Sequence, residues 1–439
     1  MRLCILTLLC SWLLALTTCA SASEPLVVIR AGTVITVSGE TYSPGMIVIE
    51  DGKIRHAGAA ITTPSSARVI AAERETVFPG LVLASTRFEL ADHPRSGNHA
   101  DARVADDVRP QQIDFDALLA NGFVAASFVP PGTGVPGRAA LYRTGGAAGV
   151  GLVSADGPLR ITFDNPGRDK RELLGILRAA QKAVKDRDKA REEWDKQQEA
   201  ARKKAEATPK PEPSGGSGAE PAVPPATPTG APPAAKPPDA PAEFKPPEVA
   251  ANLRPFMDLL DKKMAPLLVI ELAGPSDFRH LEEIQQIFPE LVGTLQLKRG
   301  FQVDYRYIAA DLGKAKARVE LQPLLDRVPN AAERFNLAAE LAEAGCELVW
   351  LPVADGADEF ARFRGRVGDL VRAGLNRDAA LKALTLHAAR ALGVDDRYGS
   401  IEKGKLADLV LLDGDPLDPA TQVTRVLIGG EIAWKRSQP

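Results

Sequence analysis

The chain has few cysteines, and almost all of them lie at its start. It holds 4 cysteines in 439 residues, of which Cys4, Cys10 and Cys19 precede position 20. If this first segment is removed, Cys346 is left alone, so an internal disulfide is excluded and stability must come from packing. Cys346 itself lies in an apolar, strand-like run, and we expect it to be a small core residue rather than a nucleophile.

Aromatic residues and concentrated basic charge are also scarce. Aromatic residues make up 5% of the chain against 45% hydrophobic residues, and the formal net charge is −3. A core rich in alanine, leucine, valine and glycine is typical of helices packed on buried parallel strands, so we expect an α/β fold. No nucleic-acid partner is expected, because such binding normally needs a concentrated basic face.

The first 22 residues have the pattern of a secretory signal peptide. Arg2 is followed by the apolar run 3–16 and then by Ala20-Ser21-Ala22, which fits a cleavage site. We therefore expect an exported protein, periplasmic or secreted, with lipidation at Cys19 as the alternative. The apolar run is too short to span a membrane, and no transmembrane segment is expected after removal of the signal.

Both ends of the mature chain predict short strands. Residues 25–79 and 396–437 alternate between apolar runs and turns, with Asp51-Gly52 and Gly429-Gly430 as hairpin turns. Strands at the two termini would be marginal alone, so they are expected to pair. The sequence predicts a small composite β-sandwich domain built from both segments.

Residues 80–395 alternate between strand-like and helical patterns, which predicts a (β/α)8 TIM-like barrel. The barrel has two interruptions. Residues 168–207 are dense in charge and predict a long, solvated helix, and residues 208–248 are rich in proline and alanine and predict a disordered insertion. The expected strands are 76–84, 122–129, 149–153, 266–272, 292–297, 317–321 and 346–353, and the clearest helices are 331–344 and 360–373.

Two motifs carry a resemblance to a known family. Pro79-Gly80-Leu81 opens a run resembling the one with which amidohydrolases enter their first barrel strand, which in that family ends in His-x-His. The run Gly399 to Val410 resembles the segment Gly-x-Ile-x-x-Gly-Lys-x-Ala-Asp-Leu-Val, which returns the family's chain to its sandwich. The resemblance covers roughly residues 26–160 and 255–437 and is strongest to the imidazolonepropionase-like branch.

The resemblance implies a divalent metal such as zinc, held by histidines and carboxylates. This chain instead has Ser85 and Arg87 at the two histidine positions, and neither residue type there offers an imidazole. No cofactor is therefore expected. If a metal is bound at all, the remaining candidates are Asp355, Glu271 and His280. The chain's five histidines, none of which matches a family ligand position, are His56, His93, His99, His280 and His387.

Arg87 cannot ligate a metal, because a guanidinium stays protonated and has no free lone pair. Beside Asp355 it is expected to form an ion pair, giving either a structural plug or an anion pocket. Asp355 matches the family's last strand-end aspartate, but it fits a turn or helix cap equally well. Lys298 and Arg299 form a basic pair that would repel a divalent cation.

The main functional hypothesis is a catalytically silent pseudoenzyme with a binding or scaffold role. The alternative implied by the resemblance is a hydrolase acting on C–N bonds of a non-peptide amide, cyclic amide or dipeptide-like substrate, with Asp355, Arg87 and Lys298 as catalytic candidates. A second alternative is an envelope assembly partner that uses the charged helix 168–207 and the Pro-rich arm. The expected partners are thus a small-molecule ligand or an envelope protein.

Overall fold

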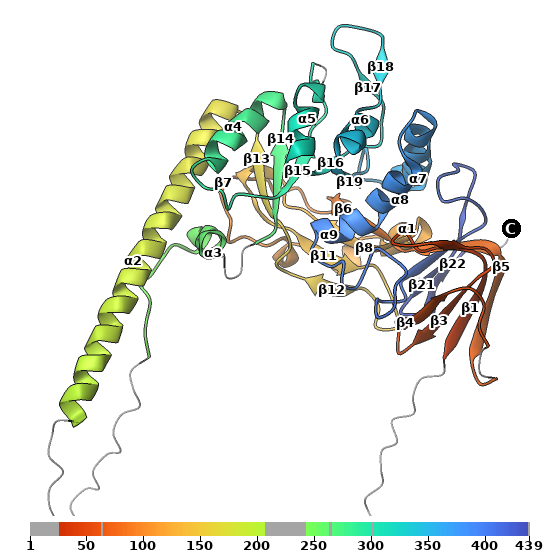
Figure 1. Ribbon diagram of the computed structural model, residues 1–439, viewed down its shortest axis with the longest axis horizontal. Helices are drawn as coiled ribbons and strands as arrows, with labels where there is room; N and C mark the ends of the chain where they lie inside the picture. The colour runs from red at the N-terminus through yellow and green to blue at the C-terminus, as the bar shows by residue number, and fades with distance from the viewer. Residues whose placement is uncertain (1–25, 63–64, 207–242, 263–265, 301, 438–439) are drawn as a thin grey trace, which may run out of the picture.

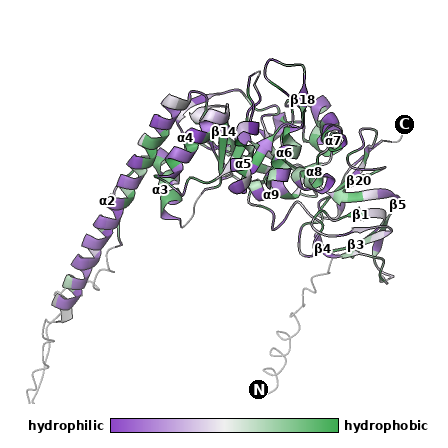
Figure 2. Cartoon of the chain, turned by 45° about the horizontal axis from the view of Figure 1, so that its top comes forward, coloured by the Kyte–Doolittle hydropathy of each residue, from purple (hydrophilic) through white to green (hydrophobic). Residues whose placement is uncertain are grey.

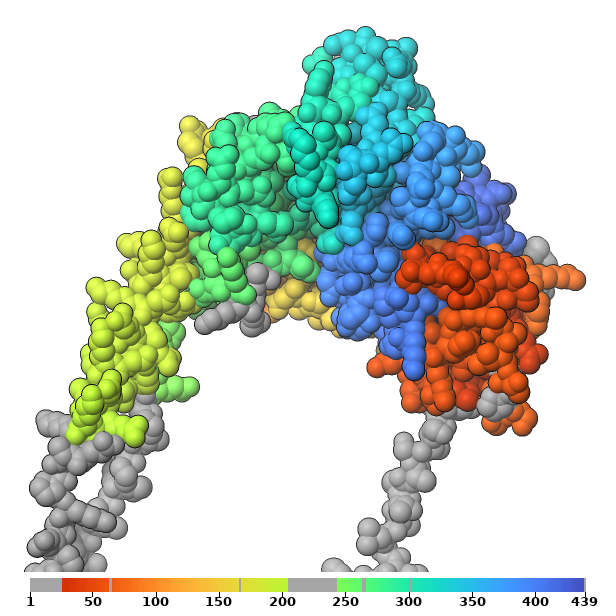
Figure 3. Space-filling model, in the orientation of Figure 1, coloured from red at the N-terminus to blue at the C-terminus, as the bar shows by residue number. Residues whose placement is uncertain are grey.

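The computed structural model describes residues 26–62, 65–206, 243–262, 266–300 and 302–437. The predicted signal peptide and most of the predicted Pro-rich insertion lie outside these ranges. Figure 1 shows a mixed α/β body with a long helix on one flank and a sheet formed by the chain ends on the other. The space-filling view places these two features at opposite sides of the molecule (Figure 3).

The terminal strands form one eight-stranded sheet in which the two ends of the chain pair. The joining ladder is antiparallel and sets Phe78 opposite Val410. The ladder of hydrogen bonds is continuous, and the sheet curls so that its inward-facing residues share one core and Lys53 bridges to Leu406, so two separate layers are not distinguished. In sheet order they are β22 (Glu431–Lys435), β21 (Val423–Ile428), β20 (Leu409–Leu412), β5 (Arg68–Pro79), β1 (Val27–Ile35), β3 (Gly45–Glu50) and β4 (Lys53–Gly58), with β2 (Thr41–Tyr42) beside β1.

Both predicted hairpin turns are confirmed. Asp51 and Gly52 connect β3 to β4 with φ values of 50° and 72°, and Gly429 and Gly430 connect β21 to β22 with φ values of 62° and 81°. Tight primed turns need positive φ at both central positions, which glycine and aspartate tolerate. The local sequence therefore sets the register of both hairpins.

The barrel region contains two sheets, a mixed one and a mainly parallel one. In the first, β6 pairs in parallel with β8, and in the second five strands follow one another in parallel. The bounds are β6 (Leu81–Thr86), β8 (Phe123–Phe128), β13 (Leu159–Phe163), β14 (Leu268–Leu272), β15 (Thr294–Leu297), β16 (Arg318–Leu321) and β19 (Glu347–Trp350). This arrangement is a TIM-barrel-type fold.

The barrel is irregular between β8 and β13. Here β10 (Gly137–Arg138) pairs antiparallel with β13, and β11 (Ala140–Arg143) pairs antiparallel with β8, so one segment joins the two sheets. Residues 149–153 were expected to supply a barrel strand, but β12 (Gly151–Ser154) is an antiparallel edge strand on β11. Across the described residues, no ladder joins β19 to β6, so a regular eight-stranded closure is not seen.

The helices cover the outside of these strands. The predicted helix 360–373 corresponds to α7, whereas the predicted helix 331–344 begins only at Leu337, because Asn336 caps it by accepting a hydrogen bond from the amide of Ala339. The residues before the cap form the hairpin β17 (Asp326–Arg327) and β18 (Arg334–Phe335). The helices are α1 (Phe115–Ala120), α3 (Arg254–Asp261), α4 (Pro275–Gln285), α5 (Arg306–Lys314), α6 (Leu337–Ala344), α7 (Ala357–Arg372), α8 (Arg377–Leu384) and α9 (Leu386–Ala391).

The predicted charged helix is confirmed as α2 (Pro166–Glu206), which is 41 residues long. Its first half packs on the body through Leu173, Leu177 and Ala180, all of which are buried. Its far half is hydrophilic in Figure 2 and carries i,i+4 ion pairs such as Arg191 with Asp195. Within the described ranges, no helix is long and apolar enough to cross a membrane.

One ion pair fastens the terminal sheet to the barrel. Asp408, which lies in the Gly399 to Val410 motif, has a side chain only 2% exposed and accepts hydrogen bonds from Arg143 of β11. The amide of Gly429 donates a further bond of 2.7 Å to the same carboxylate. The motif aspartate therefore satisfies donors from both parts of the molecule.

Candidate functional site

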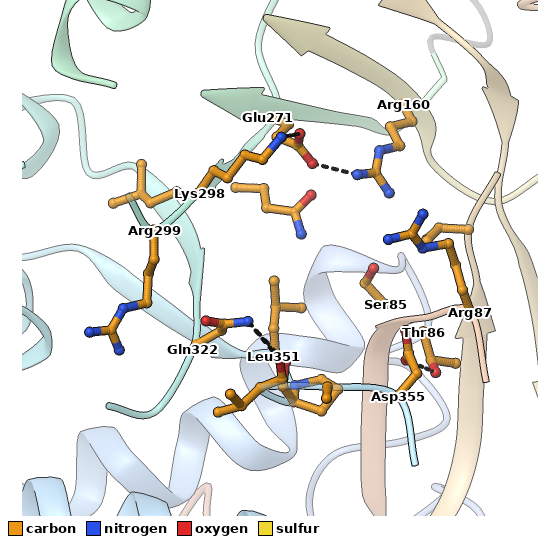
Figure 4. Close-up of a pocket in the computed structure, with 16 residues that line it drawn as sticks. Ser85, Thr86, Arg87, Arg160, Glu271, Lys298, Arg299, Gln322, Leu351 and Asp355 are labelled. Atoms are coloured by element: carbon orange, nitrogen blue, oxygen red, sulfur yellow. Dashed lines mark hydrogen bonds and ion pairs between the residues drawn. The ribbon is translucent and has the colours of Figure 1, made fainter. Parts of the chain in front are cut away.

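A pocket of about 340 Å³ opens where the barrel strands end. Ser85 and Thr86 end β6, Glu271 precedes the last residue of β14, and Leu297 ends β15, so the lining comes from the carboxyl ends of the strands. This is the face on which TIM-barrel proteins build their sites. The lining residues are Ser85, Thr86, Arg87, Val129, Arg160, Glu271, Gln296, Leu297, Lys298, Arg299, Gln322, Leu351, Pro352, Val353, Ala354 and Asp355 (Figure 4).

The predicted residues Arg87 and Asp355 share this pocket, but they do not pair. The hydroxyl of Thr86 donates to Oδ1 of Asp355, and the amide of Phe88 donates to the same hydroxyl at 3.0 Å. Arg87 is exposed, and its guanidinium makes no hydrogen bond or ion pair with any residue that the structure describes. The expected Arg87–Asp355 ion pair is therefore wrong: the side-chain contact of Asp355 is with Thr86, the neighbour of Arg87 in the chain.

Glu271 and Lys298 belong to a charged network at the rim of the pocket. Arg160 donates to Oε2 of Glu271, and the Lys298 ammonium lies 3.4 Å from Oε1 of Glu271 and 3.2 Å from Oδ1 of Asp164. Partial burial lowers the pKa of Lys298, but the charges of Glu271 and Asp164 outweigh this effect and raise the pKa. Lys298 is thus held in its charged form by two carboxylates.

The sequence reasoning missed Arg160 because it missed the strand β13. The available signal was the alternation of Leu159, Ile161 and Phe163, which are buried, with Arg160 and Thr162 between them. The Nε atom of Arg160 is buried and has no hydrogen-bond partner in the described part of the chain. One end of this guanidinium is thus anchored by Glu271, while another donor remains unused.

A second missed residue, Glu320, lies inside the barrel. Strand register places Thr162, Glu271, Gln296 and Glu320 side by side on consecutive strands. Glu320 is 1% exposed, and neither of its carboxylate oxygens has a hydrogen-bond partner among the described residues. Burial raises the pKa of Glu320 to about 7, although the charges of Arg160 and Arg318 act in the opposite direction.

His280 lies away from the pocket. It belongs to α4, where its Nδ1 atom is 3.9 Å from a carboxylate oxygen of Glu283. The three residues expected to hold a metal, if one is bound, are Asp355, Glu271 and His280, and the structure does not bring them together. Over the described ranges, no group of three or more histidine, cysteine, aspartate or glutamate side chains is arranged to hold a metal ion.

The fold and the pocket define a TIM-barrel-type α/β protein with a polar, cation-rich site at the strand ends. A family model described as the amidohydrolase family matches residues 359–433, which include the Gly399 to Val410 motif. The crystal structure of an amidohydrolase from Thermotoga maritima MSB8 aligns with a TM-score of 0.66 at 20% identity, covering 93% of this chain and 100% of that chain. The structural likeness shows a shared fold.

Two curated relatives match the chain locally. An N-substituted formamide deformylase from Arthrobacter pascens is 41% identical over 66 residues, which are 14% of this chain and 12% of that protein. An imidazolonepropionase from Pseudomonas aeruginosa is 59% identical over 39 residues, which are 9% of this chain and 10% of that protein. The matches thus cover only a small part of either relative's length. The family model and these local matches show a likeness to the amidohydrolase superfamily in part of the chain, and the structural likeness shows a shared fold.

Members of this superfamily typically use a divalent metal, and the donor set of this pocket does not fit one. Its lining carries four cationic side chains, Arg87, Arg160, Lys298 and Arg299, against the two carboxylates of Glu271 and Asp355. Glu271 is engaged by Arg160 and Lys298, and Asp355 by Thr86. A divalent cation would have to displace these donors in a positive surrounding without the help of an imidazole.

Proposed function

We propose that this protein is a ligand-binding member of the amidohydrolase superfamily that does not catalyse metal-dependent hydrolysis. The observation that carries the proposal is the composition of the pocket, where Ser85 and Arg87 stand at the positions that the motif resemblance assigns to two histidines, and both carboxylates have partners. The fold keeps the concave site at the strand ends, so binding remains supported after the metal chemistry is lost. From the signal-peptide pattern, we also propose that the protein acts outside the cytoplasm.

Restoring the two imidazoles should restore metal binding. The S85H/R87H variant places two histidines on alternate residues beside Asp355 and removes one positive charge, which gives three ligand groups of the type that zinc prefers. After dialysis against trace zinc, manganese and iron, plasma mass spectrometry should find well under one metal per chain in the unmodified protein and a rise towards one equivalent in the variant.

The control is the R87Q variant, which removes the charge without supplying an imidazole and should stay metal-free. Stoichiometric metal in the unmodified protein, together with hydrolysis of amide or cyclic amide substrates that a chelator abolishes, would overturn the proposal. Equal metal content in all three proteins would show that any metal is bound elsewhere.

A C–N bond hydrolase with a metal-free site is the second candidate. The observation favouring it is that Asp355, Arg87 and Lys298 line one pocket, so a carboxylate and two cations face the same space. If turnover of an amide is detected, Asp355→Asn should lower it by roughly 10²- to 10⁴-fold, the usual contribution of a general acid or base. Unchanged turnover in this variant would reject the candidate.

A further inference from the structure

We propose that the ligand of this pocket is a small oxyanion, carrying a carboxylate or phosphate group, that binds between Arg87 and Arg160. This inference rests on the proposed binding function and adds the chemical class of the ligand. It starts from the excess of cationic over anionic side chains in the lining. In a partly enclosed site such an excess raises the local concentration of anions.

Arg87 is the lining cation that no described residue neutralises. Its backbone is well anchored, because the flanking Thr86 is buried and bonded to Asp355, and the amide of Phe88 is bonded to Thr86. In Figure 4 the guanidinium of Arg87 extends towards the side of the pocket that holds Arg160 and Glu271. A planar guanidinium on a fixed backbone matches two oxygens of a carboxylate or phosphate.

Arg160 supplies the second contact. Glu271 fixes its orientation through one terminal nitrogen, and its buried Nε donor is unused by the described residues. Arg160 lines the pocket, and in Figure 4 its guanidinium lies beside that of Arg87, where an oxyanion can contact both. Two guanidinium groups can then share one oxyanion, as they commonly do at phosphate and carboxylate sites.

The other two cations are already occupied. Lys298 interacts with both Glu271 and Asp164. Arg299 lies 3.2 Å from Asp326 and donates to the carbonyl of Leu325 at 2.9 Å, and its guanidinium points away from Arg87 in Figure 4. These two side chains contribute positive potential to the pocket rather than direct contacts.

The size and polarity of the rest of the pocket limit the part of the ligand that lies beyond its anionic group. A volume of about 340 Å³ admits a small molecule and excludes a folded domain or a nucleic-acid duplex. The side chains of Ser85, Gln296 and Gln322 offer neutral hydrogen-bonding groups. The ligand is therefore expected to join its anionic group to a short polar body rather than to a long apolar chain.

The test is calorimetric titration of the full chain at low ionic strength with inorganic phosphate in one series and acetate and succinate in another. We expect one binding site per chain whose affinity falls as salt is added. Arg87→Gln should weaken binding of the preferred anion at least about tenfold, since it removes a charge-assisted hydrogen-bond pair. Arg87→Lys should retain part of the affinity, because it keeps the charge and loses the bidentate geometry.

The matched control is Arg327→Gln, which removes an exposed arginine on the hairpin β17–β18, outside this pocket. It should leave the affinity within about twofold, as expected for a screened charge at a distance. Equal losses in both variants, or no binding of either anion class by the unmodified protein, would overturn the inference. The metal content of the same preparation tests the proposed function separately, so the two failures can be told apart.

Discussion

Glu320→Gln should make the protein more stable at pH 8, by on the order of 3 kcal/mol. In the folded chain this carboxyl is 1% exposed, lacks hydrogen-bond partners in the described structure, and has its pKa raised to about 7 from a usual value of 4.5. The raised pKa means that ionisation of the folded state is penalised, and each pKa unit corresponds to about 1.4 kcal/mol. Glutamine has nearly the same shape and cannot ionise.

The same substitution should flatten the dependence of stability on pH. Below about pH 4.5, Glu320 is protonated in both the folded and the unfolded chain, and its stabilising contribution is fully present. As pH rises to about 7, the unfolded chain releases a proton that the folded chain retains, so the free energy of unfolding falls. Above that pH the loss is complete and constant. The charged groups that act on Glu320 are Arg160, Arg318 and Glu271.

Urea unfolding at pH 5 and pH 8 measures both effects. The two proteins should have nearly equal stability at pH 5, and the unmodified protein should become progressively less stable than Glu320→Gln towards pH 8. Glu333→Gln is the control, since this carboxyl is exposed in the loop between β17 and β18. Parallel pH profiles for the Glu320 and Glu333 variants would contradict the prediction.

Asp408→Asn should lower the free energy of unfolding by about 3 kcal/mol. This value is at the lower end of the range observed when one partner of a buried ion pair is removed. The carboxylate accepts bonds from Arg143 and from the amide of Gly429. Its amide replacement presents hydrogens or a weaker acceptor to the guanidinium. The lower figure is expected because the side chain of Arg143 is 27% exposed and can recover part of its hydration.

A double-mutant cycle with Arg143→Met isolates the pair. Arg143→Met alone should cost a comparable amount, because it leaves Asp408 buried without its counter-charge. The double variant should cost clearly less than the sum of the two. Additive losses would show that the two residues act independently and that the contact does not fasten the terminal sheet to the barrel.

Local secondary structure was predictable from the sequence. The turns at Asp51-Gly52 and Gly429-Gly430 require only that neighbouring residues tolerate positive φ, and both form as expected. The long charged helix was also recognisable, because its i,i+4 charge pattern is contained within the segment itself. Each of these features is decided by residues only a few positions apart.

Pairing between distant strands was harder to predict. Residues 149–153 have the composition of a barrel strand, yet β12 lies antiparallel at a sheet edge, since nothing within the segment specifies its partner. The neighbour of β14 in the sheet is β13. This strand contains the polar residues Arg160 and Thr162, which are more typical of a surface segment than of a buried strand. Arg160 lines the site, so a residue that gives the pocket its charge also weakened the strand signal.

The sequence predicted which residues line the site, but not which of their side chains contact one another. Ser85, Arg87, Glu271, Lys298 and Asp355 all line the pocket, because motif position places residues at strand ends. The partner of Asp355 was missed, since nothing in the sequence indicates that the hydroxyl of Thr86, and not the adjacent Arg87, contacts this carboxylate. Glu320 was missed because its burial depends on the closure of strands from distant parts of the chain.

The pairing of β5 with β20 has a consequence for the order in which the chain can fold during synthesis. Strands β1 to β5 leave the ribosome first, but the partner of β5 is made only after the whole barrel. Until then β5 presents an open edge with unpaired amides and carbonyls, the kind of surface on which sheets of separate chains join. Chains that end before Leu409 should therefore aggregate rather than accumulate as a soluble N-terminal half.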